Sequence, residues 1–153
     1  ILKSCQEPLF EKNIRVINSI DKIIPRIYCE KERLLIGLKT IYENIARHNF
    51  QTLDQNNYVK TTIESINSKI ILAIEANGNS FNPLEAFTQI TPGLCSIKKA
   101  FDKYCSVIYE SNGISYNIYN STSTISNYIK GVKITLTFLL PQPKSFSGEL
   151  LNV

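Results

Sequence analysis

The sequence predicts an all-α fold, a compact multi-helix bundle that is stapled by two disulfides. Apolar residues recur at three- and four-residue steps through most of the 153-residue chain, which is the spacing of amphipathic helices. Proline and Asn-Gly steps interrupt these runs where helices end. Four cysteines complete the prediction, because an even number in a small chain is typical of a disulfide framework.

Three helices are expected in the first half of the chain. The first covers residues 9–24 and ends at Pro25, because proline cannot continue a helix. The second covers residues 34–47. The third covers residues 59–74 and is stopped by the Asn-Gly-Asn segment 77–79, where the left-handed conformation is tolerated.

The second half begins with a short helix that Asn82 caps and that Thr91-Pro92-Gly93 breaks. A longer helix over residues 94–110 and an ordered polar loop over residues 114–124 follow. Residues 125–139 fit two structures: the apolar spacing suits a helix, whereas alternation from position 132 suits a strand. The helix is preferred, because a lone strand would have no partner elsewhere in the chain.

One disulfide-bonded domain is expected over residues 1–143, with a C-terminal tail over residues 144–153. Residues 63–74 and 125–136 share an apolar pattern, which suggests duplicated halves at about 1–78 and 79–143. The alternative is that any two amphipathic helices of this composition would align equally well.

The pairing of the cysteines depends on the helix predicted over residues 94–110. Within one helix, Cys95 and Cys105 would lie about 15 Å apart, whereas a disulfide needs α-carbons within roughly 7 Å. Bridges from Cys5 and Cys29 to these two residues are therefore favoured, in either combination. A local Cys95–Cys105 pairing stays open if the chain folds back between them. A metal site is not expected, because the cysteines lack paired spacing.

No catalytic residue and no cofactor are predicted. His48 is the one histidine, and it suits a capping position at a helix C-terminus. The sequence has no phosphate loop and no dinucleotide fingerprint. The net charge of +4 is scattered, which disfavours nucleic acid as a partner. No apolar run approaches the ~20 residues that span a membrane.

Secretion is expected, because the chain begins at Ile1 without a methionine, as after removal of a signal peptide. Asn120 begins an N-glycosylation tripeptide. A partner-binding surface is predicted where tyrosines gather beside Ser and Asn, at Tyr109, Tyr116, Tyr119 and Tyr128. The alternative is that most of these rings are half-buried core residues.

Two repeated motifs carry a resemblance to a known family. Cys5 with Tyr28-Cys29, and Cys95 with Tyr104-Cys105, resemble the paired cysteine-tyrosine-cysteine motifs of the bicycle proteins of aphids. The resemblance implies a salivary protein that is injected into plant tissue as an effector, and some members are implicated in gall development. It implies no catalytic residues.

The sequence therefore predicts a secreted, non-enzymatic effector that binds a host plant macromolecule. A helical carrier of a small apolar ligand and a cytokine-like secreted ligand are the alternatives. The identity of the host protein and the oligomeric state stay open.

Overall fold

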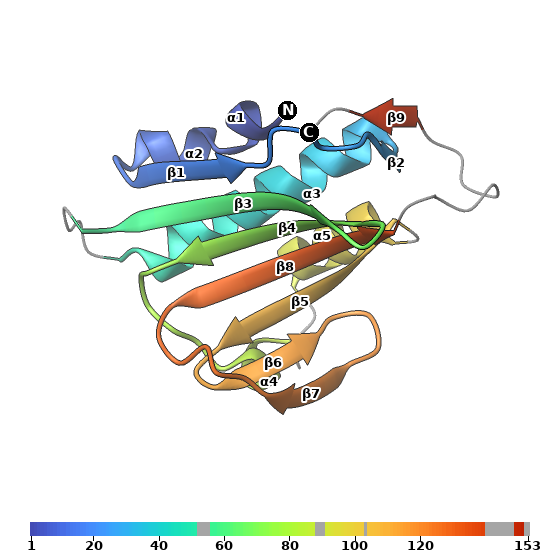
Figure 1. Ribbon diagram of the computed structural model, residues 1–153. Helices are drawn as coiled ribbons and strands as arrows, with labels where there is room; N and C mark the ends of the chain where they lie inside the picture. The colour runs from blue at the N-terminus through green and yellow to red at the C-terminus, as the bar shows by residue number, and fades with distance from the viewer. Residues whose placement is uncertain (52–55, 88–90, 103, 140–148, 152–153) are drawn as a thin grey trace.

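The computed structural model of the chain has two layers, with helices covering one face of a seven-stranded sheet (Figure 1). The structure describes residues 1–51, 56–87, 91–102, 104–139 and 149–151. The prediction of an all-α bundle is wrong, because most of the segments assigned to helices beyond residue 57 are strands.

The sheet joins strands from both predicted halves of the chain. From one edge to the other it contains β1 (Arg15–Ile20), β3 (Tyr58–Ile66), β4 (Lys69–Ala76), β8 (Val132–Leu139), β5 (Cys105–Ser111), β6 (Ile114–Asn117) and β7 (Thr122–Ile125). β1 runs parallel to β3, and every other neighbouring pair is antiparallel. β2 (Ile27–Cys29) and β9 (Glu149–Leu151) form a separate antiparallel pair.

The helical layer consists of a few short helices and two longer ones. The helices are α1 (Leu2–Cys5), α2 (Glu7–Glu11), α3 (Lys31–Asn44), α4 (Pro83–Ala86) and α5 (Pro92–Phe101), and α3 continues into the π-helical turn η1 (Ile45–Asn49). α3 and α5 pack against each other on the sheet. α3 confirms the helix predicted over residues 34–47. The predicted cap is also confirmed, because the Leu84 N–H donates to Asn82 Oδ1 at 3.0 Å.

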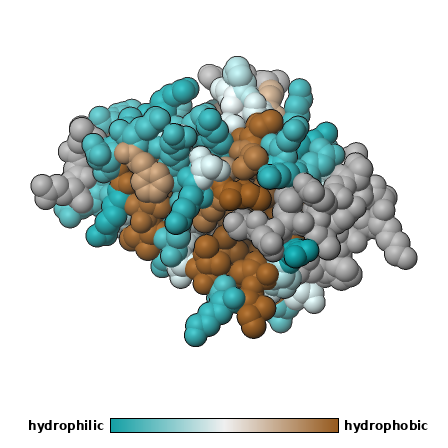
Figure 2. Space-filling model, turned by 90° about the horizontal axis from the view of Figure 1, so that it is seen from above, coloured by the Kyte–Doolittle hydropathy of each residue, from teal (hydrophilic) through white to brown (hydrophobic). Residues whose placement is uncertain are grey.

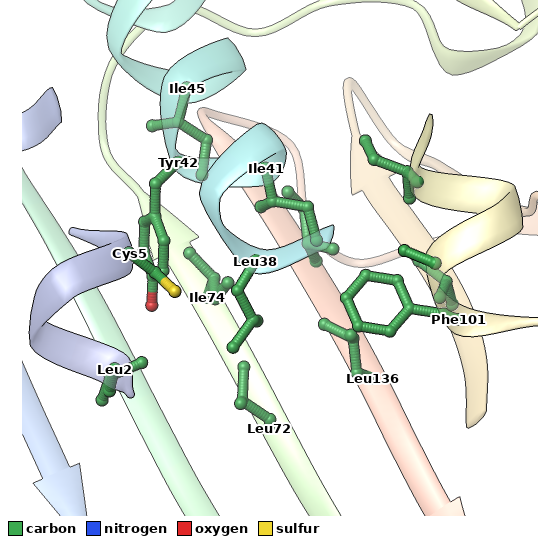
Figure 3. Packing of buried hydrophobic residues seen from close by; sticks show 14 of the residues in the cluster. Leu2, Cys5, Leu38, Ile41, Tyr42, Ile45, Leu72, Ile74, Phe101 and Leu136 are labelled. Carbon is green, nitrogen blue, oxygen red and sulfur yellow. The ribbon is translucent and has the colours of Figure 1, made fainter. Parts of the chain in front are cut away.

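The hydrophobic core lies between this helical layer and the sheet. In Figure 3, Leu38 and Ile41 of α3 point toward the strands that carry Leu72 and Leu136. The two long helices approach closely at Gly37, where a Cβ atom would lie 2.5 Å from Cζ of Phe101. The other face of the central strands is half-buried, which is the alternation of an antiparallel sheet covered on one side.

The helix predicted over residues 59–74 is a β-hairpin. Asn67 and Ser68 have positive φ angles of 49° and 60°, and they form the two-residue turn that joins β3 to β4. Residues four apart, such as Val59 and Ile63, lie on one face of a helix and also on one face of a strand. The apolar spacing was therefore compatible with both structures.

The other helix predictions fail in part. The helix expected over 9–24 ends at Glu11, and β1 follows. The helix expected over 94–110 ends at Phe101, and its second part is β5. The predicted loop 114–124 contains β6 and most of β7, whereas the end of the segment 125–139 is β8. Of the predicted tail 144–153, only β9 is among the described residues.

Candidate functional site

A cavity of about 550 Å³ opens between the helical layer and the sheet. Its volume falls within the roughly 300–1,000 Å³ of typical ligand sites. Apolar side chains from both layers form its floor: Ile41, Ile45, Phe81, Phe87, Val132 and Ile134. Polar residues also contribute to its lining: Asn44, Arg47, His48, Asn49, Ser80 and Thr91. This combination of an apolar floor and a few polar groups is typical of a small-molecule site.

The end of α3 and the turn η1 place four of the polar residues, Asn44, Arg47, His48 and Asn49. Ile41 and Ile45 lie one turn apart and are both buried, so they anchor the end of the helix to the core. Asn44, which precedes Ile45, lines the cavity. The α-helix then continues as the wider π-helical turn η1, in which Arg47 and His48 are exposed. Lys12 holds this turn, because its ammonium donates to the carbonyl oxygen of Ala46 at 2.5 Å. Such wider turns are frequent at functional sites.

The N-terminus of α5 opens into the same cavity. Thr91 caps the helix, since its Oγ1 accepts a hydrogen bond from the Leu94 N–H at 3.2 Å, and Pro92 occupies the first helical position. Gly93 lies beside Asn44: a Cβ atom at this position would be 3.2 Å from Asn44 Nδ2. The first turn of a helix has free N–H groups and a positive dipole end, which favour a bound anion.

Three aromatic rings line the cavity, and a fourth ring packs against one of them outside it. Phe87 packs edge-on to Tyr109 with ring centroids 4.8 Å apart, and it stacks on Tyr116 at 5.2 Å. Phe81 completes the cluster with edge contacts to Phe87 and Tyr109. Phe81, Phe87 and Tyr109 line the cavity, whereas Tyr116 supports Phe87 from behind.

The electrostatic character of the cavity is neutral to positive. Among the described residues, no Asp or Glu side chain lines it, and Arg47 supplies a formal charge. The described residues contain no group of three or more His, Cys, Asp or Glu side chains that could form a metal centre. The amide oxygen of Asn44 is the group best suited to ligate a hard cation that arrives bound to an anionic ligand.

The four tyrosines of the predicted binding surface do not form one exposed surface in the structure. Tyr109 and Tyr116 are buried in the aromatic cluster. Tyr119 donates a hydrogen bond to the carbonyl oxygen of Lys98 at 2.8 Å, and Tyr128 is half-buried, with burial raising its pKa to about 12. Asn120 is exposed, and its Oδ1 accepts a hydrogen bond from Thr122 at 2.7 Å.

The expectation of two disulfides is wrong, because all four cysteines are free thiols in the structure. Cys5 and Cys29 are buried, and each donates to a backbone carbonyl, of Leu35 and Glu30 respectively. Burial raises the pKa of Cys29 to about 11 and holds that of Cys105 well above its usual range. Cys95 is partly exposed on α5.

Tyr104, the tyrosine of the second motif, is not among the described residues that line the cavity. Tyr104 is buried just before β5, and the side chain of Tyr28 lies outside the described residues.

His48, expected at a helix end, does lie there and also lines the cavity. As for membrane association, none of the helices in the described ranges has the length and hydropathy needed to cross a bilayer.

Sequence reasoning did not single out Asn44, Arg47, Phe87 or Gly93. A usable signal was present at Thr91-Pro92-Gly93, since a Thr cap followed by proline marks the start of a helix. The prediction used these residues to end the preceding helix. Asn44 carried no signal of its own, because its role depends on the position of α5.

Comparisons with known proteins identify the fold. No family model and no curated protein matches the sequence. Among solved structures, the chain is similar to the histidine kinase domain of the blue-light activated histidine kinase from Erythrobacter litoralis EL346. The TM-score is 0.62 at 11% identity, over 92% of this chain and 59% of that chain. This chain therefore spans less than two thirds of the length of that structure's chain.

Two further structures agree with this likeness. The catalytic domain of histidine kinase ThkA matches with a TM-score of 0.62 at 15% identity, over 90% of both chains. Full-length ShkA in complex with AMPPNP matches with a TM-score of 0.58 at 16% identity, over 98% of this chain and 30% of that chain. The chain thus has the fold of histidine kinase catalytic domains.

This likeness overturns two of the sequence-based predictions. A non-enzymatic host-binding effector was expected, whereas the fold is one that serves as the catalytic domain of kinases. The all-helical, disulfide-bonded scaffold that was expected for such a protein is also wrong. The resemblance to the bicycle proteins and the secreted location stay predictions.

Proposed function

We propose that the chain binds a nucleoside triphosphate in the cavity between α3, α5 and the sheet, as the catalytic module of a kinase-type phosphotransferase. The observation that carries the proposal is the opening of the α5 N-terminus into an apolar cavity that Arg47 also lines. A nucleotide needs both features, since its base is flat and largely apolar and its phosphates are anionic. The AMPPNP complex of the similar ShkA supports this assignment.

The base would lie on the floor of the cavity. Phe81, Phe87 and Ile134 supply flat or branched apolar surface there, and the ring edges are already packed against one another. A planar heterocycle on such a surface gains from apolar burial and from ring contacts.

The phosphates would lie at the start of α5. Pro92 has no N–H, and the N–H groups of Leu94 and Cys95 are engaged by Thr91, so the Gly93 N–H is the donor left in this first turn. Glycine lets an anion approach this N–H closely. Arg47 would add a charge-assisted hydrogen bond from η1.

A divalent cation would be held by the phosphates, water and the Asn44 amide oxygen. When bound, it would neutralise charge on the phosphoryl group during transfer. The residues of the chain would supply positioning and electrostatic stabilisation, which account for most of the catalysis of phosphoryl transfer. The names of the similar proteins suggest that a histidine side chain accepts the phosphoryl group.

A fluorescence titration with N-methylanthraniloyl-ATP tests the proposal. Saturable binding is expected, with displacement by ATP and weakening when EDTA removes Mg²⁺. Asn44→Ala and Arg47→Ala are expected to weaken binding about tenfold, as loss of a hydrogen bond to a charged group would.

Two variants outside the cavity serve as controls. Arg33→Ala removes an arginine from the same helix, where it pairs with Glu30 at 2.7 Å, and Asn127→Ala removes an exposed asparagine. Both should bind as the unmodified chain does. Absence of saturable, ATP-displaceable binding in the unmodified chain would refute nucleotide binding.

A further inference from the structure

The Tyr109 side chain has an unusual position in the cavity. It belongs to β5, it lines the cavity, and it is 6% exposed. Phe87 packs against its ring at 4.8 Å and Phe81 at 6.3 Å, so the ring is held firmly. Rigid placement is what a recognition residue needs, since little side-chain freedom is lost on binding.

The Tyr109 hydroxyl has no hydrogen-bond partner within the described part of the chain. That part also contains no fully enclosed side-chain oxygen or nitrogen atom that lacks a partner. The hydroxyl must therefore keep a small accessible surface, and the cavity is the open space that its residue lines. A buried polar group without a partner is costly unless a ligand or water satisfies it.

The other polar groups near the floor are already engaged. Ser80 accepts a hydrogen bond from the Gly131 N–H at 2.8 Å and donates to the carbonyl oxygen of Ile129. Asn49 donates to the carbonyl oxygen of Asn79. Asn44, Arg47, His48 and Thr91 come from the end of α3, from η1 and from the start of α5, where the phosphates are placed. The Tyr109 hydroxyl is thus the group available for the base.

We propose that the Tyr109 hydroxyl is the group that contacts the base, and that it makes the cavity tolerant of either purine. The inference rests on the proposed nucleotide binding. A carboxylate would accept hydrogen bonds only, whereas a phenol both donates and accepts. It can accept from the amino group of adenine or donate to the carbonyl oxygen of guanine. Burial raises the pKa of Tyr109, which keeps the phenol protonated.

The charge of the lining supports the same conclusion. Among the described residues that line the cavity, none carries a carboxylate that would select a donor edge of the base. A site that relies on one neutral hydroxyl discriminates by the energy of one hydrogen bond. The affinities of ATP and GTP are therefore expected to lie within about tenfold of each other.

Titration calorimetry of ATP and GTP against three forms of the chain tests the inference. Tyr109→Phe removes the hydroxyl and keeps the ring. Tyr116→Phe is the matched control, because Tyr116 is the cross-strand neighbour of Tyr109, is also buried, and does not line the cavity. Tyr109→Phe should lower the affinity for both nucleotides about five- to tenfold, whereas Tyr116→Phe should bind both as tightly as the unmodified chain does.

The unfolding of the nucleotide-free variant adds an independent readout. The hydroxyl has no protein partner, so Tyr109→Phe should unfold at the same temperature as the unmodified chain or higher. The NMR signal of tyrosine labelled with ¹³C at Cζ provides a second independent readout. The Tyr109 resonance is identified as the one that is absent from Tyr109→Phe. In the unmodified chain this resonance should shift when either nucleotide is added.

The possible outcomes separate this inference from the proposed function. If neither nucleotide binds the unmodified chain, the proposed function fails and the inference fails with it. If nucleotides bind and Tyr109→Phe binds them equally well, or its resonance does not shift, Tyr109 does not contact the base. If GTP binds more than about a hundredfold more weakly than ATP, a difference beyond one neutral hydrogen bond, the purine tolerance is overturned.

Discussion

Asn49 and Asn79 are joined by two hydrogen bonds. The Asn49 side-chain amide donates to the Asn79 carbonyl oxygen at 2.7 Å, and the Asn79 N–H donates to the Asn49 carbonyl oxygen at 2.7 Å. The pair ties η1 to the segment that follows β4. Since η1 carries Arg47 and His48, the position of these two residues depends on this connection.

Gly78→Ala should break the connection. A Cβ atom at Gly78 would collide with the Asn49 carbonyl oxygen, which is a backbone atom and cannot turn aside as a side chain can, so one segment must move. Overpacking of this kind costs roughly 1–3 kcal/mol, and the upper end is expected here. Urea denaturation would measure it. A free energy of unfolding within about 0.5 kcal/mol of that of the unmodified chain would contradict the close contact.

Gly93→Ala should affect ligand affinity rather than stability. The added methyl group would lie 3.2 Å from Asn44 Nδ2, a side-chain atom that can shift, and alanine suits a helix better than glycine. The free energy of unfolding should therefore change by less than about 0.5 kcal/mol or rise. The affinity for the fluorescent nucleotide should fall, because the methyl group crowds the Gly93 N–H and Asn44. Equal affinity would argue against phosphate at this position.

Tyr42→Phe should destabilise the chain, because it disrupts a buried polar network between α3 and β3. The Tyr42 and Thr61 hydroxyl oxygens are 2.6 Å apart, and Gln6 Nε2 donates to Tyr42 at 3.2 Å; all three side chains are buried. A loss of about 1–2 kcal/mol is expected. A double-mutant cycle with Thr61→Val should give a coupling energy above about 0.5 kcal/mol. Additive losses would show that the hydroxyls act independently.

The stability of the chain should decrease at high pH through Cys29. Burial raises its pKa from 9.0 to about 11, so the folded state holds the thiol proton more tightly than the unfolded state. This contribution is complete below pH 9 and is lost as the pH rises toward 11. The free energy of unfolding should fall over this interval, and less steeply in Cys29→Ala. Cys95→Ala, which removes a partly exposed thiol, serves as the control.

The sequence allowed α3 and the start of α4 to be predicted, because a long amphipathic period and an Asn-Pro cap are local signals. It did not distinguish β3 and β4 from a helix. Their apolar residues recur every four positions, as Ile70 and Ile74 do, and this step suits both structures. The alternation from Val132 does indicate a strand, and the partners that the sequence-based prediction lacked are β4 and β5.

The site was less predictable than the fold. Its residues come from the end of α3, η1, the segment 80–87, the start of α5 and two strands, β5 and β8, and only the fold brings them together. Tyr109 was predicted as part of a partner-binding surface, because tyrosines gather beside Ser and Asn in this part of the sequence. The structure turns its ring inward, because it occupies an alternate position of β5 on the covered face.

The position of β8 has a consequence for how the chain folds. β8 is the last long strand in the sequence, yet it lies between β4 and β5 and joins β1-β3-β4 to β5-β6-β7. During synthesis, neither group of strands can complete its pairing until residue 139 has emerged. Val132 and Ile134 of the same strand line the cavity. Ligand binding would therefore report the final, long-range step of folding, which is expected to be the slow one.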